Sequence, residues 1–162
     1  MVIVTRPVLT VPVEIPQLPL LVIATVKTLI SNLFQVPATS DEWKNVESGF
    51  RQRWNFPGCV GALDGKHIVI RAPTATGSDY YNYKNSFSIV LMALADSDYC
   101  FLYVDVGAKG RGSDGGIFQN SSLYKAFETN YFAMPNDFLI VGDDAFPLKT
   151  YLMKPYSRRN MS

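Results

Sequence analysis

The hydrophobic residues of this chain change from a helical to a strand-like period near residue 57. In segments 20–34 and 41–53 the apolar positions recur three and four residues apart, which predicts two amphipathic helices. Pro37 ends the first, and the polar run that starts at Thr39 offers an N-cap for the second. The apolar positions are Val22, Val26, Leu29, Ile30 and Leu33 in the first helix and Trp43, Val46 and Phe50 in the second.

After a Phe-Pro-Gly break at residues 56–58, the chain contains short runs of aliphatic residues bounded by turn residues. Runs of this length and composition predict buried strands. The second and third runs are joined by Asp96-Ser97-Asp98, which predicts a hairpin. The expected strands are residues 59–70, 87–95, 99–106 and 138–141.

Two further helices are expected around the last of these strands. Ser113 can cap a helix that begins near Asp114, and Pro147 can start a short helix after the strand at 138–141. The order is then strand, strand pair, helix, strand, helix. It predicts an α/β fold, a mixed sheet with helices on its faces. The expected buried positions are Ile117, Phe118, Leu123 and Phe127, then Leu148, Tyr151, Leu152 and Met153.

Composition is that of one globular domain. The 162 residues are enough to bury a core, and a net charge of +1 neither requires nor excludes a polyanionic partner. Cys59 and Cys100 lie in apolar runs and are expected to be buried thiols, which indicates a reducing compartment. The apolar segment 2–21 contains four prolines, so neither a spanning helix nor a signal peptide is predicted.

Three aspartates are candidates for chemistry. Asp64 interrupts the first apolar strand, where a carboxylate is costly to bury unless a partner such as a divalent metal pairs with it. An Asp-Gly turn is the alternative at this position. The strand at 138–141 runs straight into Gly142 and Asp143, at an edge where sites are often built. Asp114 falls in the first turn of a helix, where it can also be a partner of the helix dipole.

Two loops combine features that suit a nucleic-acid backbone. Residues 71–85 contain Tyr80, Tyr81, Tyr83 and Lys84, and interleaved aromatic and basic residues can stack on bases and hold phosphates. Tyrosines that pack the loop onto the surface explain the same pattern. Residues 107–116 are rich in glycine and carry two basic residues, but they lack the Lys-Ser/Thr ending of a nucleotide-binding P-loop.

Four runs, taken together and in this order, resemble the PIF/Harbinger transposases and their domesticated, nuclease-like relatives. They are residues 56–67, 81–84, 112–118 and 142–148, which include Cys-Val-Gly-Ala-Leu-Asp-Gly-Lys-His and Gly-Asp-Asp-Ala-Phe-Pro-Leu. The resemblance covers roughly residues 22–160 and implies an RNase H-like fold of the DDE superfamily. The domain division expected from it is an N-terminal extended segment with two helices at 1–56 and a partial DDE catalytic domain at 57–162.

The resemblance also implies a chemistry, which is DNA cleavage by a two-metal mechanism with Mg²⁺ or Mn²⁺. Asp64 corresponds to the first family acid, Asp143 to the acid after the fourth strand, and Asp114 to a further acidic position. Hard cations held by carboxylates suit phosphodiester cleavage, since they clamp the attacking and leaving oxygens. Of the two later acids, strand order favours Asp143 for direct ligation. Asp96, Asp98, Asp105 and Asp144 are expected to be structural.

One departure leaves the activity open. The family places a third acid, a Glu, on a helix beyond the segment at 155–156, and no residue here matches it. The alternative is therefore a catalytically inactive transposase remnant that acts as a DNA- or protein-binding module. The resemblance further implies a nuclear protein with a Myb/SANT-like DNA-binding partner and no membrane association. If one face of the sheet is left bare, an exposed apolar patch predicts self-association, which light scattering would test.

Overall fold

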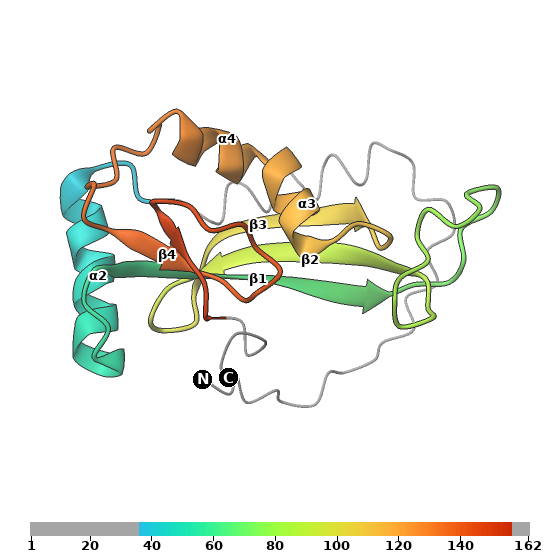
Figure 1. Ribbon diagram of the computed structural model, residues 1–162, viewed down its shortest axis with the longest axis horizontal. Coiled ribbons are helices and arrows are strands. Elements are labelled where there is room, and N and C mark those ends of the chain that lie inside the picture. Colours follow the sequence, from blue (N-terminus) through green and yellow to red (C-terminus); the bar gives the residue numbers. More distant parts are fainter. Residues whose placement is uncertain (1–35, 157–162) are drawn as a thin grey trace.

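The computed structural model describes residues 36–156 and shows one mixed sheet with helices packed on it (Figure 1). The sheet has five strands in the order β3-β2-β1-β4-β5. Strand β1 pairs antiparallel with β2 and parallel with β4, and β5 adds in parallel to β4. This is an RNase H-like α/β fold, as expected. The strands are β1 (Cys59–Val69), β2 (Ser88–Ala95), β3 (Phe101–Lys109), β4 (Leu139–Val141) and β5 (Leu152–Met153).

Three helices belong to the described part of the chain, and two of them cover one face of the sheet. Helices α3 (Asp114–Asn120) and α4 (Ser122–Glu128) lie along that face, while α2 (Ser40–Trp54) packs on β1 at the end where this strand begins (Figure 1). Helix α2 starts at a capping box between Thr39 and Glu42. The helix expected at residues 20–34 lies outside the described residues.

Most expected elements agree with the structure within two or three residues, but two helices differ. The segment after Asp114 forms two helices rather than one, because Ser121 is extended and its Oγ accepts a hydrogen bond from the Tyr124 N–H at 3.1 Å. The helix expected from Pro147 is wrong. The free edge of β4 pairs there with β5, as the Ile140 N–H bonds the Tyr151 carbonyl at 2.8 Å.

Several burial expectations also need correction. Leu148 and Met153, which were expected to pack, are 69% and 44% exposed. Strand β1 is buried only in its first half, and Asp64 itself is exposed, as are Ile68 and Val69. Cys100 is exposed rather than buried, because it lies just before β3 at the turn of the hairpin, whereas Cys59 is fully buried. The metal-site argument for Asp64 therefore depends on its neighbours rather than on the cost of burial.

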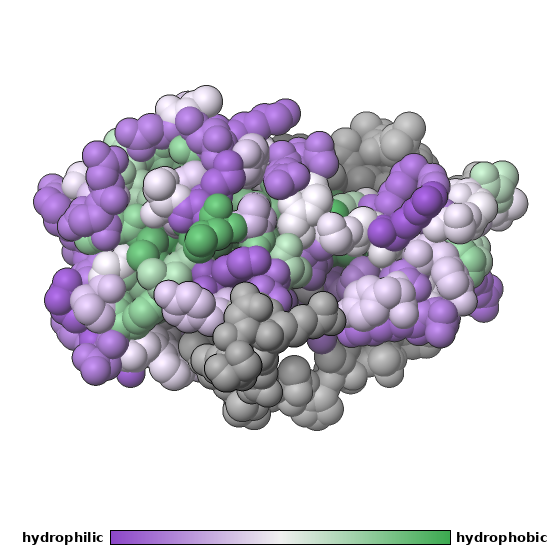
Figure 2. Space-filling model, in the orientation of Figure 1, coloured by the Kyte–Doolittle hydropathy of each residue, from purple (hydrophilic) through white to green (hydrophobic). Residues whose placement is uncertain are grey.

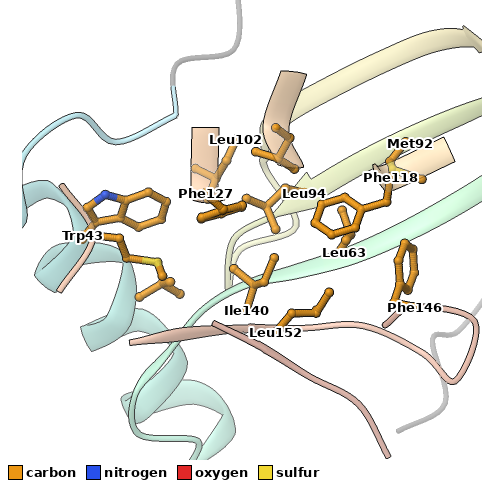
Figure 3. Packing of buried hydrophobic residues seen from close by; sticks show 13 residues of the cluster. Trp43, Leu63, Met92, Leu94, Leu102, Phe118, Phe127, Ile140, Phe146 and Leu152 are labelled. Atoms are coloured by element: carbon orange, nitrogen blue, oxygen red, sulfur yellow. The ribbon is translucent and has the colours of Figure 1, made fainter. Parts of the chain in front are cut away.

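The core fills the space between the sheet and α3 and α4 (Figure 3). Phe118, Leu123 and Phe127 of the helices meet Leu63, Leu94 and Ile140 of the central strands. Trp43 of α2 is fully buried at one end of this core, and its indole N–H donates to the Phe132 carbonyl at 2.9 Å. The core thus fixes β1 and β4 as neighbours, which positions the aspartates described next.

Hydrophobic side chains also reach the surface, in groups between hydrophilic ones (Figure 2). On the exposed half of β1, Val69 is 70% and Ile68 is 38% exposed. Self-association through such a patch stays a prediction. None of the helices between residues 36 and 156 is long and apolar enough to cross a bilayer.

Candidate metal centre

Strand register brings Asp64 and Asp143 to corresponding positions on neighbouring strands. Ala62 of β1 pairs with Val141 of β4, and each aspartate lies two residues further along its own segment. Adjacent strands lie about 4.8 Å apart and side chains alternate between faces, so Ala62 and Val141 share a face. β4 ends at Val141, but a Cβ on Gly142 would meet Phe146 of the core, so Asp143 follows on the face of Asp64. We call these residues the Asp64–Asp143 pair.

A backbone N–H group orients each carboxylate of the pair. The Gly65 N–H donates to Asp64 Oδ1 at 2.8 Å, and the Ala145 N–H donates to Asp143 Oδ1 at 2.9 Å. Both bonds are local, within two residues along the chain, so they hold the side chains in place without using contacts from elsewhere. The other oxygen of each carboxylate remains available to a ligand.

Asp114 approaches the pair from the other side of β1. Leu63 packs in the core beneath α3 and α4, so alternation directs Gly65 to the helix face and Asp64 to the opposite face. A Cβ on Gly65 would lie 2.2 Å from Asp114 Oδ1. The Asp114 carboxylate therefore occupies the space that any side chain at position 65 would need.

A second glycine lets the start of α3 approach the Asp143 turn. A Cβ on Gly115 would lie 2.5 Å from the Ala145 carbonyl oxygen, so only glycine permits this approach without a shift. Ser113 caps the helix, since its Oγ accepts a hydrogen bond from the Gly116 N–H at 3.2 Å. The two glycines bring three acidic side chains into one region.

The pKa values of Asp64 and Asp114 both respond to the negative charge of Asp143. Although the Asp64 side chain is exposed, partial desolvation by the surrounding protein raises the pKa of its carboxyl; the Gly65 hydrogen bond lowers this pKa and the negative charge of Asp143 raises it. Burial also raises the pKa of Asp114, followed by repulsion from Asp143 and Asp64, while His67 and Lys84 act in the opposite direction. Both carboxyls thus favour the protonated form more than a free aspartate does. A cation placed among them relieves that repulsion.

The fit to a metal ion can be tested on the side chains themselves. Asp114 Oδ1 is buried and has no hydrogen-bond partner, and a buried carboxylate oxygen left without a donor fits a cation ligand. Among residues 36–156, however, no three His, Cys, Asp or Glu side chains converge closely enough to hold one ion. The division between two faces explains this: the pair projects from one side of β1 and Asp114 reaches it from the other.

Three of the aspartates that were expected to be structural have structural partners. Asp96 Oδ1 accepts from the backbone N–H groups of Asp98 and Cys100, at 2.8 and 2.9 Å, and closes the hairpin turn. Asp98 pairs with Arg53 of α2, and Asp144 pairs with Lys154 at 3.3 Å.

The sequence did not indicate a buried polar network beside Asp114. Ser88 is fully buried, and its Oγ lies 2.8 Å from His67 Nδ1 and 2.8 Å from Asn82 Nδ2. Through these contacts the tyrosine-rich loop is tied to β1, with the Tyr83 ring edge-on to His67 at 5.5 Å. A lone Asn within a Tyr-Asn-Tyr-Lys run, followed by Ser at a strand start, was the only available signal.

The glycine-rich basic loop and α3 together line an open hollow. Lys109 and Arg111 line this hollow together with Asp79 and Asp105. Lys109 Nζ forms an ion pair with Asp79 Oδ2 at 2.5 Å, so part of the positive charge is already compensated. The hollow is therefore mixed in charge rather than a basic groove.

Comparison with known proteins agrees with this architecture. The family model for DDE superfamily endonuclease matches residues 63–162. The rat protein named "Putative nuclease HARBI1" is 31% identical over 125 residues, which cover 77% of this chain and 35% of the relative. An Arabidopsis thaliana protein named "Protein ALP1-like" is 33% identical over 138 residues, covering 78% of this chain and 33% of the relative.

The human HARBI1 is 30% identical over 125 residues, covering 77% of this chain and 35% of the relative. The chain thus spans about a third of the length of the curated relatives it matches. No solved structure matches it. Together with the RNase H-like sheet and the aspartates at its edge, these matches show that the chain belongs to the DDE superfamily endonucleases, as a member of the Harbinger-derived nuclease family.

Proposed function

We propose that this chain carries part of the catalytic centre of a metal-dependent DNA endonuclease. The observation that carries the proposal is the β1–β4 register, which brings Asp64 and Asp143 to corresponding positions on one face. The orphaned oxygen of Asp114 supports it, because a buried acceptor without a donor suits a cation. Asp64, Asp143 and Asp114 are the residues that would hold Mg²⁺ or Mn²⁺.

Such ions, when bound, lower the pKa of the attacking water and stabilise the oxygens that gain charge during phosphodiester cleavage. The protein's own part is to hold the ligands. The Gly65 and Ala145 N–H groups fix one oxygen of each member of the Asp64–Asp143 pair, and exposure of both side chains leaves the other oxygen open to substrate and solvent. Lys66 shares the face of Asp64 and supplies a positive charge beside it.

Calorimetry with Mg²⁺ and Mn²⁺ on this chain and on Asp64→Asn tests the proposal. Binding by the parent and its loss in the variant is the expected result, because Asn keeps the shape but lacks the charge that a hard cation needs. The matched control is Asp98→Asn, an aspartate that pairs with Arg53 at the hairpin turn. If parent and both variants bind equally, or none binds, the aspartates do not form the metal site.

A second function class has its own support. Because no three potential ligands among residues 36–156 converge on one point, a chain that binds DNA or protein without cutting it is the alternative. It predicts DNA binding that Asp64→Asn leaves unchanged and no cleavage in either protein. Cleavage that depends on both metal and Asp64 would exclude it.

Partner, compartment and boundaries follow from the proposed activity. The substrate is DNA, the compartment is the nucleus, and the family resemblance suggests a Myb/SANT-like protein as the partner that recognises the target. We place the start of the catalytic domain at residue 57 and note that α2 nevertheless contributes Trp43 to its core. Co-purification with a Myb/SANT-like protein would test the proposed partner, and nuclear fractionation would test the proposed compartment.

A further inference from the structure

A relay of three side chains fixes the protonation pattern of His67. Asn82 is 4% exposed, and its Oδ1 accepts from the backbone N–H groups of Lys84 and Ser86, at 2.9 and 3.2 Å. These two donors determine which end of the amide is the carbonyl. Asn82 Nδ2 must therefore donate to Ser88 Oγ, at 2.8 Å.

The Ser88 hydroxyl can then donate its hydrogen to only one acceptor within the described residues. It is fully buried, and within the described part of the chain the only acceptor in hydrogen-bond reach of its Oγ is His67 Nδ1, at 2.8 Å. A buried hydroxyl hydrogen without an acceptor costs about 1–3 kcal/mol. Ser88 therefore donates to Nδ1, and in the neutral imidazole the proton must be on Nε2.

The Nε2–H donor is not used by the protein. No described residue accepts a hydrogen bond from it, and the His67 ring is half-buried rather than enclosed. His67 and Gly65 lie on the same face of β1, two residues apart, and Gly65 is the residue against which Asp114 packs. A fixed donor therefore stands next to the candidate metal centre without a partner of its own.

The surroundings indicate an anionic acceptor. Lys84 follows Tyr83 in the loop that the relay anchors, and its Nζ lies 5.3 Å from the centre of the Tyr83 ring. The Tyr83 ring lies edge-on to His67 at 5.5 Å, so Lys84 stands in the same neighbourhood as the imidazole. The positive charges of His67 and Lys84 both lower the pKa of Asp114. The Tyr83 ring is 78% exposed and offers a stacking surface beside them. These three groups together match a nucleotide. The His67 donor and the Lys84 cation suit phosphate oxygens, and the exposed Tyr83 ring suits a base.

We propose that His67 is a substrate-positioning residue, whose Nε2–H, presented by the Asn82–Ser88 relay, donates to a non-bridging phosphate oxygen of the DNA strand beside Asp114. The inference rests on the proposed DNA substrate and adds to it a specific donor, its tautomer and the residues that set it. Lys84 contributes charge to the same phosphate, and Tyr83 contacts the adjacent base.

The tautomer can be measured directly, because His67 is the only histidine of the chain. Nitrogen-15 NMR at about pH 8, where free imidazole is neutral, should show the proton on Nε2 in the parent and a mixture of both tautomers in Ser88→Ala. Ser48→Ala on α2 is the matched control and should resemble the parent. A proton on Nδ1 in the parent would overturn the proposal. This readout needs neither metal nor activity.

Binding supplies the second test. Fluorescence anisotropy measures binding of a short single-stranded oligonucleotide, in EDTA to prevent cleavage. Two variants are compared. In His67→Gln the side-chain Nε2–H reproduces the histidine donor, whereas in His67→Asn the amide reaches only the position of Nδ1. We expect binding about tenfold weaker for the Asn variant, the fold-change of one hydrogen bond to a charged group, and within about threefold of the parent for the Gln variant. Equal binding by both variants and the parent overturns the proposal.

If circular dichroism shows that the Asn variant does not fold, an NMR titration of the nitrogen-15-labelled parent with oligonucleotide decides instead. The Nε2–H signal of His67 should shift as oligonucleotide is added, and a signal that does not shift refutes the contact. Failure of the proposed nuclease function gives a different pattern. The tautomer and the ranking of the variants in binding would then stand, while cleavage dependent on Asp64 would be missing.

Discussion

Replacing Gly65 by alanine tests how closely Asp114 must approach β1. The new methyl carbon would lie 2.2 Å from Asp114 Oδ1, 2.6 Å from Cγ and 3.2 Å from Oδ2. Ordinary contact begins near 3.4 Å, so the carboxylate has to withdraw by more than about 1 Å, or α3 has to shift by a similar amount. Because Asp114 is the first residue of α3 and half-buried, rotation of its side chain is the easier response.

A displacement of that size is large for a metal ligand. Mg²⁺ requires oxygens at about 2.0–2.1 Å in near-octahedral geometry, and a misplacement of about 1 Å can reduce a rate by about 10²-fold. We therefore expect Gly65→Ala to weaken Mn²⁺ or Mg²⁺ binding in calorimetry by at least about tenfold and to lower metal-dependent cleavage by about 10²-fold. The free energy of unfolding should fall by only about 1–3 kcal/mol, the usual cost of overpacking.

Gly116→Ala is the matched control on the same helix. Its methyl would lie 3.1 Å from Ser113 Oγ, so a displacement of a few tenths of an ångström suffices, and alanine should favour the helix by about 0.5–1 kcal/mol. Metal binding should be unchanged in this variant. If Gly65→Ala remains folded and binds metal as tightly as the parent, then Asp114 is not part of the metal site, and the reasoning from its orphaned oxygen is refuted.

Three other changes have expected outcomes set by single contacts. The fold raises the pKa of Asp114, so its charged form destabilises the protein at neutral pH, and this penalty disappears as the pH falls through the raised pKa. In the absence of metal, Asp114→Asn should therefore raise the thermal unfolding midpoint by more at pH 8 than at pH 4. Gly110→Ala should cost about 1–3 kcal/mol in urea unfolding, because the methyl would lie 2.2 Å from Ser88 Oγ and 2.5 Å from its carbonyl oxygen. The hydrogen bond from the Gly58 N–H lowers the pKa of the buried Glu47 carboxyl. The stabilisation that the charged Glu47 gives the fold is therefore present above about pH 4.3 and is lost as the pH falls through the folded-state pKa. Glu47→Ala should lower the free energy of unfolding in urea by about 1–3 kcal/mol at pH 7 and by less at pH 3.

The hydrophobic periodicity was enough to predict the central strands and α2, because their sequences agree locally with the structure. Strand β5 shows where this fails. Residues after Pro147 have apolar spacing compatible with a helical turn, but the edge of β4 offers unpaired backbone groups, and pairing there satisfies them. A tertiary partner of this kind cannot be seen in a window of local sequence.

The candidate site shows the same division between local and distant information. The places of Asp64 within β1 and of Asp143 just after β4 were predictable, because each is a carboxylate within or just after an apolar run; their role as metal ligands stays a prediction. The relay through Ser88 was not, since it joins residues from a loop and two strands and depends on register and burial. Exposure of Asp64 was also missed, because an apolar run does not reveal that the second half of β1 lacks a covering layer in the described structure.

Strand alternation decides which residues can complete the proposed metal site. The Asp64–Asp143 pair lies on the face of the sheet opposite α3 and α4, whereas Asp114 begins α3 and approaches over Gly65. Divalent metals that cleave phosphodiesters need several oxygens around each ion, and substrate and water supply only part of them. A further protein ligand for the pair must therefore come from an element that packs on the face of Asp64, Lys66 and Ile68. Asp114, on the helix side, is better placed for a second ion than for sharing the first.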